Sequence, residues 1–282
     1  MFKYILICSL ILLSSMYSVN AQENILVYAG PGTGPQSVAN TLGMLQELVA
    51  AKYTVRTVDA ADILQNDWTQ NTSLLIIPGG ADLPYVAKLS GVGNTNIKNY
   101  VASGGKFLGI CAGAYYAADK IEFYKGDPAL EITGERELKF FPGIVSGPTY
   151  IGFDDRKTEN TDGIRAAVIN WHTDDVMAES ELVVYYNGGG HFVAADSYKN
   201  IKPLAYHATP DDAVAAKLAA IVECKVGIGK AILSGVHFEW EPQNIDPKSE
   251  RLALIKQQLS EHNASRLALA RQLLTRLDIE VK

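Results

Sequence analysis

Three short apolar runs, each leading into a glycine-containing corner, constrain the fold of this 282-residue chain more than any other feature. They are NILVYAG (24–30), SLLIIPGG (73–80) and KFLGI (106–110), each the length of a buried strand. Segments with apolar residues at helical spacing lie between them, at 35–52 and 94–104. This alternation predicts an α/β fold, with a doubly wound, mainly parallel sheet flanked by helices.

The corners that follow these runs predict where a site should lie. A further strand is expected at YTVRTVDA (53–60), which alternates and is rich in β-branched residues. In doubly wound sheets, ligands bind beyond the carboxyl ends of the strands. We therefore expect the corners at Gly30, Gly79 and Cys111 to share one edge of the sheet.

The second half of the sequence is less regular. We expect a turn around Pro142-Gly143 and a strand at 181–195 that the three glycines after Asn187 interrupt. Two further strands, joined at Gly227-Ile228-Gly229, and one or two closing helices within 249–277 are predicted. No repeat, linker or domain boundary is found, so residues 22–282 are predicted to form a single domain.

Charge and residue spacing exclude several partner classes. The net charge is −6, and no cluster of Lys and Arg would suit a phosphate backbone, so nucleic acid is not an expected partner. GPGTG (30–34) lacks the remaining residues of a dinucleotide or P-loop motif. The histidines and carboxylates lack the spacing of metal ligands. We expect neither a cofactor nor a metal.

The N-terminus has the layout of a secretory signal peptide. Lys3 precedes an apolar core at 5–13, and small residues, Val19 and Ala21, occupy the −3 and −1 positions of a cleavage site. The alternative is an uncleaved anchor, but the apolar core is shorter than the ~20 residues of a membrane span. We expect cleavage after Ala21 and a secreted or periplasmic protein without stable membrane insertion.

Cleavage would leave two cysteines, Cys111 and Cys224. In an oxidising compartment the two could form a disulfide. Cys224 lies in the apolar segment AAIVECKVG (219–227) and is typical of a buried structural thiol. Cys111 instead stands on the corner FLGICAGAYYA, between a predicted strand and a predicted helix.

The corner at Cys111 has the features of a nucleophile elbow. A sharp turn from a strand into a helix needs small neighbours, and Gly109 and Gly113 supply them. The N-terminus of a helix lowers the pKa of a thiol, and the backbone N–H after the nucleophile can hold an oxyanion. The alternative is a buried cysteine at a tight helix entry.

A thiolate nucleophile needs a base, and the base needs an orienting group. His237 ends a β-rich run, and Glu239 follows two residues later. On an extended chain these two side chains would face the same side, so Glu239 is expected to orient the imidazole toward Cys111. The other histidines are His172, His191, His207 and His262, and none has such a setting.

The ordered set of these motifs resembles a known family. The G-x-C-x-G elbow followed by His-x-Glu resembles the class I glutamine amidotransferase-like superfamily, which implies a flavodoxin-like sheet. LLIIPGGADLPYVAKLSGVGNTNIKNYVASGGKFLGICAGAYYA, GERELKFFPGIVSGP and YYNGGGHF are similar to the N-terminal domain of eukaryotic biotin–protein ligases, which also occurs free-standing in bacteria. The adenylate loop of the biotin-transferring domain is not found, so no biotin ligase domain is expected.

The resemblance implies roles for individual residues. Cys111 would be the nucleophile, His237 the general base and Glu239 its orienting carboxylate. The backbone N–H groups of Ala112 and Gly80 would form the oxyanion site. Superfamily members commonly have proline between the histidine and the glutamate, whereas this chain has phenylalanine at 238.

Residues near the three corners are candidate pocket residues. They are Gly79, Asp82, Leu83, Tyr85, Tyr115, Tyr116, Asn187, Gly188 and Gly189. Core packing is the alternative for the tyrosines, a helix cap is the alternative for Asp82, and a plain tight turn is the alternative for the glycines.

Two functions from different classes follow. The first is an exported cysteine hydrolase or amidotransferase-like protein that attacks an amide or ester carbonyl of a small-molecule or peptide substrate through a thioester. The second is a non-catalytic protein that binds a ligand in the same cleft. An exported thiol is exposed to oxidation, which favours the second, whereas the predicted Cys–His–Glu set favours the first.

Overall fold

The structure is a computed structural model that describes residues 23–154, 161–172, 180–208 and 217–282. The predicted signal peptide lies outside the described residues, so its cleavage stays a prediction. Among the helices that are described, none combines the length and the apolar character needed to cross a bilayer.

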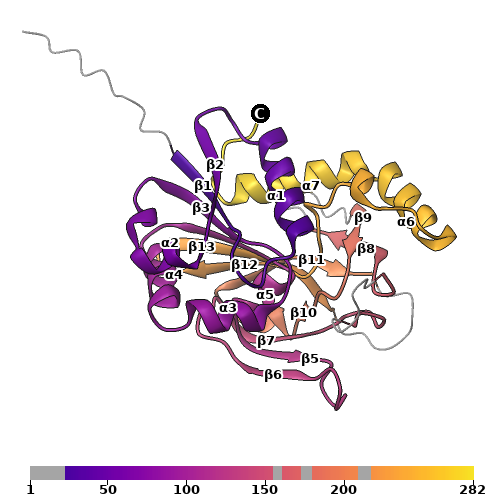
Figure 1. Ribbon diagram of the computed structural model, residues 1–282, viewed down its shortest axis with the longest axis horizontal. Helices are drawn as coiled ribbons and strands as arrows, with labels where there is room; N and C mark the ends of the chain where they lie inside the picture. The colour runs from indigo at the N-terminus through magenta and orange to yellow at the C-terminus, as the bar shows by residue number, and fades with distance from the viewer. Residues whose placement is uncertain (1–22, 155–160, 173–179, 209–216) are drawn as a thin grey trace, which may run out of the picture.

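One mixed sheet forms the centre of the molecule, with helices on both faces (Figure 1). The strands are β1 (Glu23–Tyr28), β2 (Tyr53–Val58), β3 (Thr72–Ile77), β4 (Lys106–Ile110), β5 (Ala118–Phe123), β6 (Ile132–Glu135), β7 (Phe141–Gly147), β8 (Arg165–Trp171), β9 (Ser180–Tyr186), β10 (His191–Phe192), β11 (Ile201–His207), β12 (Ala219–Val226) and β13 (Gly229–Ser234). The helices are α1 (Pro35–Leu48), α2 (Ala60–Gln65), α3 (Asp82–Leu89), α4 (Val92–Ala102), α5 (Ala112–Tyr116), α6 (Glu250–Glu261) and α7 (Asn263–Arg276), with 3₁₀ turns at Asp67–Thr69, Ala195–Ser197 and Pro242–Asn244.

One half of the sheet, which contains the first four strands and β13, is parallel. Its strand order is β2-β1-β3-β4-β13, and every neighbouring pair in this series is parallel. The prediction of an α/β fold with a doubly wound sheet is therefore confirmed. The sheet continues from β13 through antiparallel strands to β12 and β10, and then to β7, β5 and β6, while β11, β8 and β9 branch from β12.

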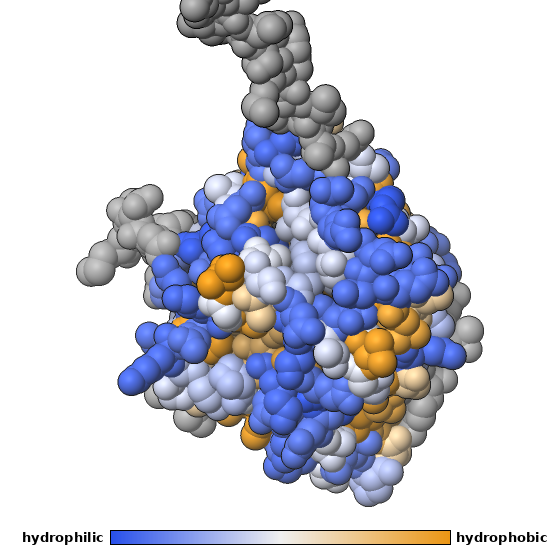
Figure 2. Space-filling view, turned by 90° about the vertical axis from the view of Figure 1, so that its left-hand side faces the viewer, coloured by the Kyte–Doolittle hydropathy of each residue, from blue (hydrophilic) through white to orange (hydrophobic). Residues whose placement is uncertain are grey.

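The faces of the parallel strands explain the two helical layers. In β1, Leu26 and Tyr28 face the cluster that includes α3 and α4, whereas Ile25 and Val27 face the cluster that includes α1 and α7. Alternate residues of one strand thus enter two different cores, which is why these runs are apolar throughout. On the side where α2 and α4 lie, hydrophilic residues cover most of the surface (Figure 2).

In the second half of the chain, one prediction from the sequence is wrong. Pro142 and Gly143 do not form a turn but lie within β7, where two residues of β7 oppose one residue of β5. Such a bulge tolerates proline, which has no N–H to donate to the ladder. A Cβ at Gly143 would lie 2.6 Å from the hydroxyl oxygen of Tyr198, so glycine leaves room for that side chain. The predicted joining of β12 and β13 at 227–229 is confirmed.

The boundaries of the helices differ from the predicted ones. The first helix ends at Leu48, earlier than expected, and the closing segment forms two helices, one of the two outcomes predicted. The short helix α2 was not predicted. A reciprocal cap between Asp59 and Asp62 begins it, and a helix of this length leaves little periodicity in the sequence.

Close backbone packing holds the corner between β4 and α5. A Cβ at Gly113 would lie 2.0 Å from the carbonyl oxygen of Ile77, and a Cβ at Gly109 would lie 2.7 Å from the carbonyl oxygen of Gly113. A side chain fits at neither position unless the backbone moves. The corner therefore requires both glycines of the G-x-C-x-G sequence.

Gly113→Ala is expected to lower the free energy of unfolding by about 2–4 kcal/mol, because the new methyl group would collide with backbone rather than with a mobile side chain. The matched control is Gly43→Ala in the middle of α1, where a Cβ would meet only a carboxylate oxygen of Glu241, at 3.2 Å. The control should be neutral or stabilising by up to about 1 kcal/mol. Urea unfolding followed by circular dichroism measures both variants, and equal stabilities would contradict the packing argument.

Candidate active site

Cys111 occupies a strained position between the centre of the sheet and α5. Its φ is +51° and its ψ is −107°, a conformation that residues with a Cβ rarely adopt. Its N–H donates to the carbonyl oxygen of Ser234 (2.7 Å), and its thiol donates to the carbonyl oxygen of Asn187 (3.8 Å). The side chain is only 7% exposed. The elbow predicted from the sequence is present.

Strand β13 brings His237 to the cysteine. It runs parallel to β4 with Ser234 beside Ile110, so the chain leaves both strands at the same edge. His237 follows shortly after, and its N–H donates to the carbonyl oxygen of Tyr185 (2.9 Å). A Cβ at Gly79 would lie 2.7 Å from Cε1 of His237 and 3.4 Å from Cβ of Cys111. Both side chains therefore lie next to the second glycine corner, at residues 78–80 after β3 (the second corner).

The predicted pairing of His237 with Glu239 is present, but for a different reason. Nδ1 of His237 lies 2.7 Å from Oε1 of Glu239, and both side chains are buried. Residues 238 and 239 form a turn rather than a strand, so alternation along an extended chain does not explain the contact. Instead, the buried guanidinium of Arg266, from α7, donates to the carbonyl oxygen of Phe238 (2.9 Å) and holds the turn.

Ser37 makes the second hydrogen bond to Oε1 of the carboxylate, whereas the buried Oε2 has no hydrogen-bond partner among the described residues. It is buried in the first turn of α1, and its hydroxyl donates to Oε1 of Glu239 (3.2 Å). The same hydroxyl accepts a hydrogen bond from the N–H of Gly79 (2.9 Å). The sequence analysis missed this residue, because a serine near a helix start is typical of local capping and carries no sign of a partner two hundred residues away.

The electrostatics of His237 favour its charged form. Burial by itself lowers the pKa of this imidazole, but the negative charge of Glu239, then that of Cys111, and hydrogen bonds to both side chains raise the pKa to about 10. An imidazolium beside Cys111 is therefore the form expected at neutral pH.

Two backbone N–H groups beside the cysteine have no hydrogen-bond acceptor among the described residues. They belong to Gly80 and Ala112, the positions that the sequence analysis chose for an oxyanion site. The N–H of Gly79 is already bound to Ser37. Gly80 has a φ of +154°, and a Cβ there would lie 1.9 Å from the carbonyl oxygen of Gly32. The corner at 78–80 therefore depends on this glycine.

Cys111 lies where two cavities meet. The first cavity, of about 310 Å³, is lined by residues of the second corner, α3, the elbow and the β5–β6 region. The second, of about 250 Å³, is lined by residues near the start of α1, by Tyr185 and Asn187, and by His237 and Trp240. Gly80, Cys111 and Phe153 line both cavities, so the two cavities adjoin at the elbow and form one cleft.

Most of the predicted pocket residues line this cleft. Asp82, Leu83, Tyr115 and Gly188 line the first cavity, and Gly79 and Asn187 line the second. Lining residues that the sequence did not indicate include Gln36, Pro84, Phe153, Tyr185 and Trp240, together with the apolar residues of β5 and β6. The motif search gave no signal for them, since ordinary strand and loop residues occur throughout the chain.

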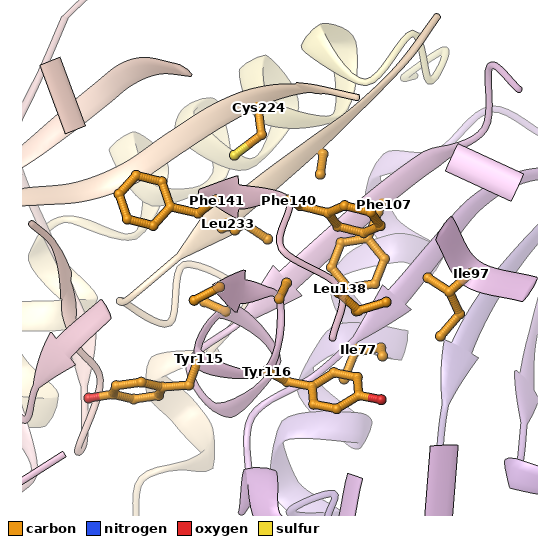
Figure 3. Close-up of a cluster of buried hydrophobic side chains, with 14 of the residues drawn as sticks. Ile77, Ile97, Phe107, Tyr115, Tyr116, Leu138, Phe140, Phe141, Cys224 and Leu233 are labelled. Atoms are coloured by element: carbon orange, nitrogen blue, oxygen red, sulfur yellow. The ribbon is translucent and has the colours of Figure 1, made fainter. Parts of the chain in front are cut away.

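Three predicted pocket residues line neither of the two cavities, as far as the described residues define them. Tyr85 is buried, and its hydroxyl donates to the carbonyl oxygen of Pro78 (3.0 Å), beneath the second corner. The hydroxyl of Tyr116 donates to the side chain of Asn94 in the core. Figure 3 shows that Tyr115 and Tyr116 point to opposite sides of α5. For Tyr85 and Tyr116 the core-packing alternative is correct.

Gly189 is the third of these residues, and it packs against backbone. A Cβ there would lie 1.7 Å from the carbonyl oxygen of Gly235, in the segment that leads to His237. The hydroxyl of Tyr115 donates to the carbonyl oxygen of neighbouring Gly188 (3.2 Å). The glycine turn thus packs against the segment that leads to His237, and Gly188 is the part of it that lines the cleft.

Asp82 is not a helix cap but half of a buried ion pair. Its carboxylate accepts hydrogen bonds from Nε of Arg136 (2.6 Å), and Nη2 of that guanidinium lies at the same distance. Burial raises the pKa of Asp82, although Arg136 opposes the shift.

Cys111 and Cys224 are both free thiols, so the disulfide considered above is absent from the described residues. Cys224 lies in the core with Phe141 and Leu233 (Figure 3), where burial raises its pKa. Among the described residues, no three His, Cys, Asp or Glu side chains are grouped as a metal site requires.

Comparison with known proteins decides the family. Residues 23–282 match the family model described as "Biotin-protein ligase, N terminal". The chain belongs to this family. The biotin–protein ligase of Schizosaccharomyces pombe is 34% identical over 236 residues, which are 82% of this chain but 36% of the ligase. The chain thus spans about a third of that relative, and the match contains no ligase catalytic domain.

Two further proteins are similar to this chain, one in sequence and one in fold. An uncharacterized protein of Chlamydia muridarum is 31% identical over 245 residues, which are 86% of this chain and 90% of that protein. A glutamine amidotransferase from Thermotoga maritima has a similar structure, with a TM-score of 0.52 over 91% of this chain and 98% of its own. Its identity is 9%, so this likeness concerns the fold alone.

The pKa of His237 offers a direct test of the site. In a Cys111→Ser protein we expect it to stay above the ordinary value of 6.5, because the charge of Glu239 remains. Adding Glu239→Gln should bring the pKa below 6.5, since burial then prevails. NMR titration of the histidine ring protons measures both values, and loss of a signal in His237→Asn assigns it. Equal pKa values in the two proteins would contradict this electrostatic account.

Proposed function

We propose that this protein is an exported cysteine hydrolase that cleaves an amide or ester of a small-molecule or peptide substrate. One observation carries the proposal. A buried carboxylate, an imidazole and a cysteine on a strained elbow follow one another in contact, and the cysteine opens into a two-sided cleft. Neither the packing of the core nor the fold requires a carboxylate, an imidazole and a thiol to lie in contact in this order.

The first step would form a thioester. The sulfur of Cys111, as the thiolate, attacks the carbonyl carbon, and the carbonyl oxygen takes the charge of the tetrahedral intermediate. The N–H groups of Gly80 and Ala112, which lack other acceptors among the described residues, would donate to that oxygen. The imidazolium of His237 then gives its proton to the leaving nitrogen or oxygen as the bond to the acyl carbon breaks.

The second step would release the acid. Neutral His237 takes a proton from water, the hydroxide attacks the thioester carbonyl, and the same two N–H groups hold the second oxyanion. Collapse of this intermediate expels the Cys111 thiolate beside the imidazolium that formed when the ring took the proton from water. Glu239 orients the ring through Nδ1 in both steps.

Two further residues would act through Glu239 and His237 as positioning residues. Ser37 ties the carboxylate to the N–H of Gly79, and Arg266 fixes the turn between the histidine and the glutamate. Their replacement should disturb the orientation of the imidazole while leaving the reacting atoms in place.

Hydrolysis of a panel of chromogenic esters and anilides tests the proposal. Cys111→Ser and His237→Ala are each expected to lower kcat by about 10³-fold or more, because one loses the nucleophile and the other the proton donor. The matched control is Cys224→Ala, which removes the other buried thiol and should leave kcat within a factor of about two.

The alternative of a non-catalytic binding protein predicts a different result on the same panel. Stabilisation of the protein by an uncleaved amide, without turnover of any ester or anilide, would favour it. Turnover that survives in Cys111→Ser would contradict the proposed hydrolase outright.

Export is proposed from the N-terminal sequence, in which small residues at 19 and 21 follow a short apolar core. Expression of the full chain in a bacterial host with a periplasm should yield a protein that begins at Gln22 in the periplasmic fraction or the medium. Ala21→Arg should block processing, because a bulky charged residue does not fit the −1 position of the cleavage site. Recovery of a protein that begins at Met1 in the cytoplasm would contradict export.

A further inference from the structure

The two cavities beside Cys111 differ in their chemistry. The first is lined by apolar side chains from α3, β5, β6 and the segment after β7: Leu83, Pro84, Ile121, Phe123, Ile132 and Phe153. The second is lined by the aromatic side chains of Phe153, Tyr185 and Trp240 together with Gln36, Asn187 and His237. A substrate that spans the sulfur therefore meets apolar side chains on both sides and the imidazole on one side only.

The position of the imidazole indicates which cavity holds the leaving group of the substrate and which holds its acyl group. His237 lines the second cavity and is absent from the described residues that line the first. The leaving group takes its proton from this imidazole, so it must lie in the second cavity. The acyl half then extends across the sulfur into the first cavity, on the side of the N–H of Ala112.

Charge in the first cavity restricts the acyl half further. Of the described residues that line it, Asp82 alone has a charged side chain, and Arg136 already pairs with that carboxylate at 2.6 Å. A zwitterionic acyl group, such as that of glutamine, would lose its hydration there without gaining a free charged partner. An apolar group would gain from the same burial.

We infer that the substrate carries an apolar group on its acyl side, of the size of a phenyl ring or a leucine side chain. The inference rests on the proposed function. The volume is sufficient, since the first cavity measures about 310 Å³ and a cavity of roughly 150 Å³ holds benzene. The amidotransferase-like fold is thus combined with a cleft that disfavours glutamine.

Anilides that share one leaving group test the inference. We expect kcat/KM for phenylacetyl-p-nitroanilide to exceed that for acetyl-p-nitroanilide by at least about 100-fold, with γ-glutamyl-p-nitroanilide no better than the acetyl compound. Equal values for the first two, or a preference for the γ-glutamyl compound, would overturn the inference while leaving the proposed hydrolase intact.

Leu83 provides the variant, because it lines the first cavity and is half exposed, so its replacement should not unfold the protein. Leu83→Glu is expected to lower the phenylacetyl-to-acetyl ratio of kcat/KM by about 10-fold or more, and Leu83→Met should restore most of it. Leu254→Glu is the matched control, an exposed leucine on α6 that lines neither cavity, and it should leave the ratio unchanged.

A binding measurement distinguishes failure of this inference from failure of the proposed function. If no anilide is cleaved, the proposed function fails, and protection of Cys111 from iodoacetamide still tests the cleft. Phenylacetamide should slow alkylation at concentrations at which acetamide does not, and Leu83→Glu should abolish the difference. Equal protection by the two amides would overturn the inference even without turnover.

Discussion

The parallel pairing of β4 with β13 is the interaction on which the site depends. It sets Ile110 beside Ser234, and the N–H of Cys111 continues the ladder by donating to the carbonyl oxygen of Ser234. Both chains leave the sheet at this point, one into the elbow and the other toward His237. A thiol and an imidazole far apart in the sequence therefore meet at one edge of the sheet.

The buried carboxylate of Glu239 explains why other elements converge on the same place. An ionised group with no exposed surface is costly unless it is paired and hydrogen-bonded. His237 and Ser37 both bond to Oε1, Oε2 has no hydrogen-bond partner among the described residues, and the charge of Arg266 lies close enough to interact with the carboxylate. The carboxylate of Glu239 thus interacts with residues from three elements: the start of α1, the turn after β13 and the helix α7. Its negative charge in turn favours the charged form of His237.

The sequence predicts the strands and the elbow well because their signals are local. Apolar runs and the glycines around Cys111 report what the adjacent backbone must do. It predicts the partner of His237 but not the geometry, since a turn held by Arg266 depends on a helix that begins much later in the chain. Tyr115 and Tyr116 show the same limit, because the orientation of α5 decides which neighbour faces the cleft, and that orientation comes from packing against β3.

The central claim is that folding places a charged imidazole against the thiol at 111 and that this imidazole makes the sulfur reactive. The rate of alkylation by iodoacetamide at neutral pH measures this directly, with Cys111→Ser as the blank. The account predicts rapid modification that slows by about tenfold or more in His237→Asn. Equal rates in the two proteins would contradict it.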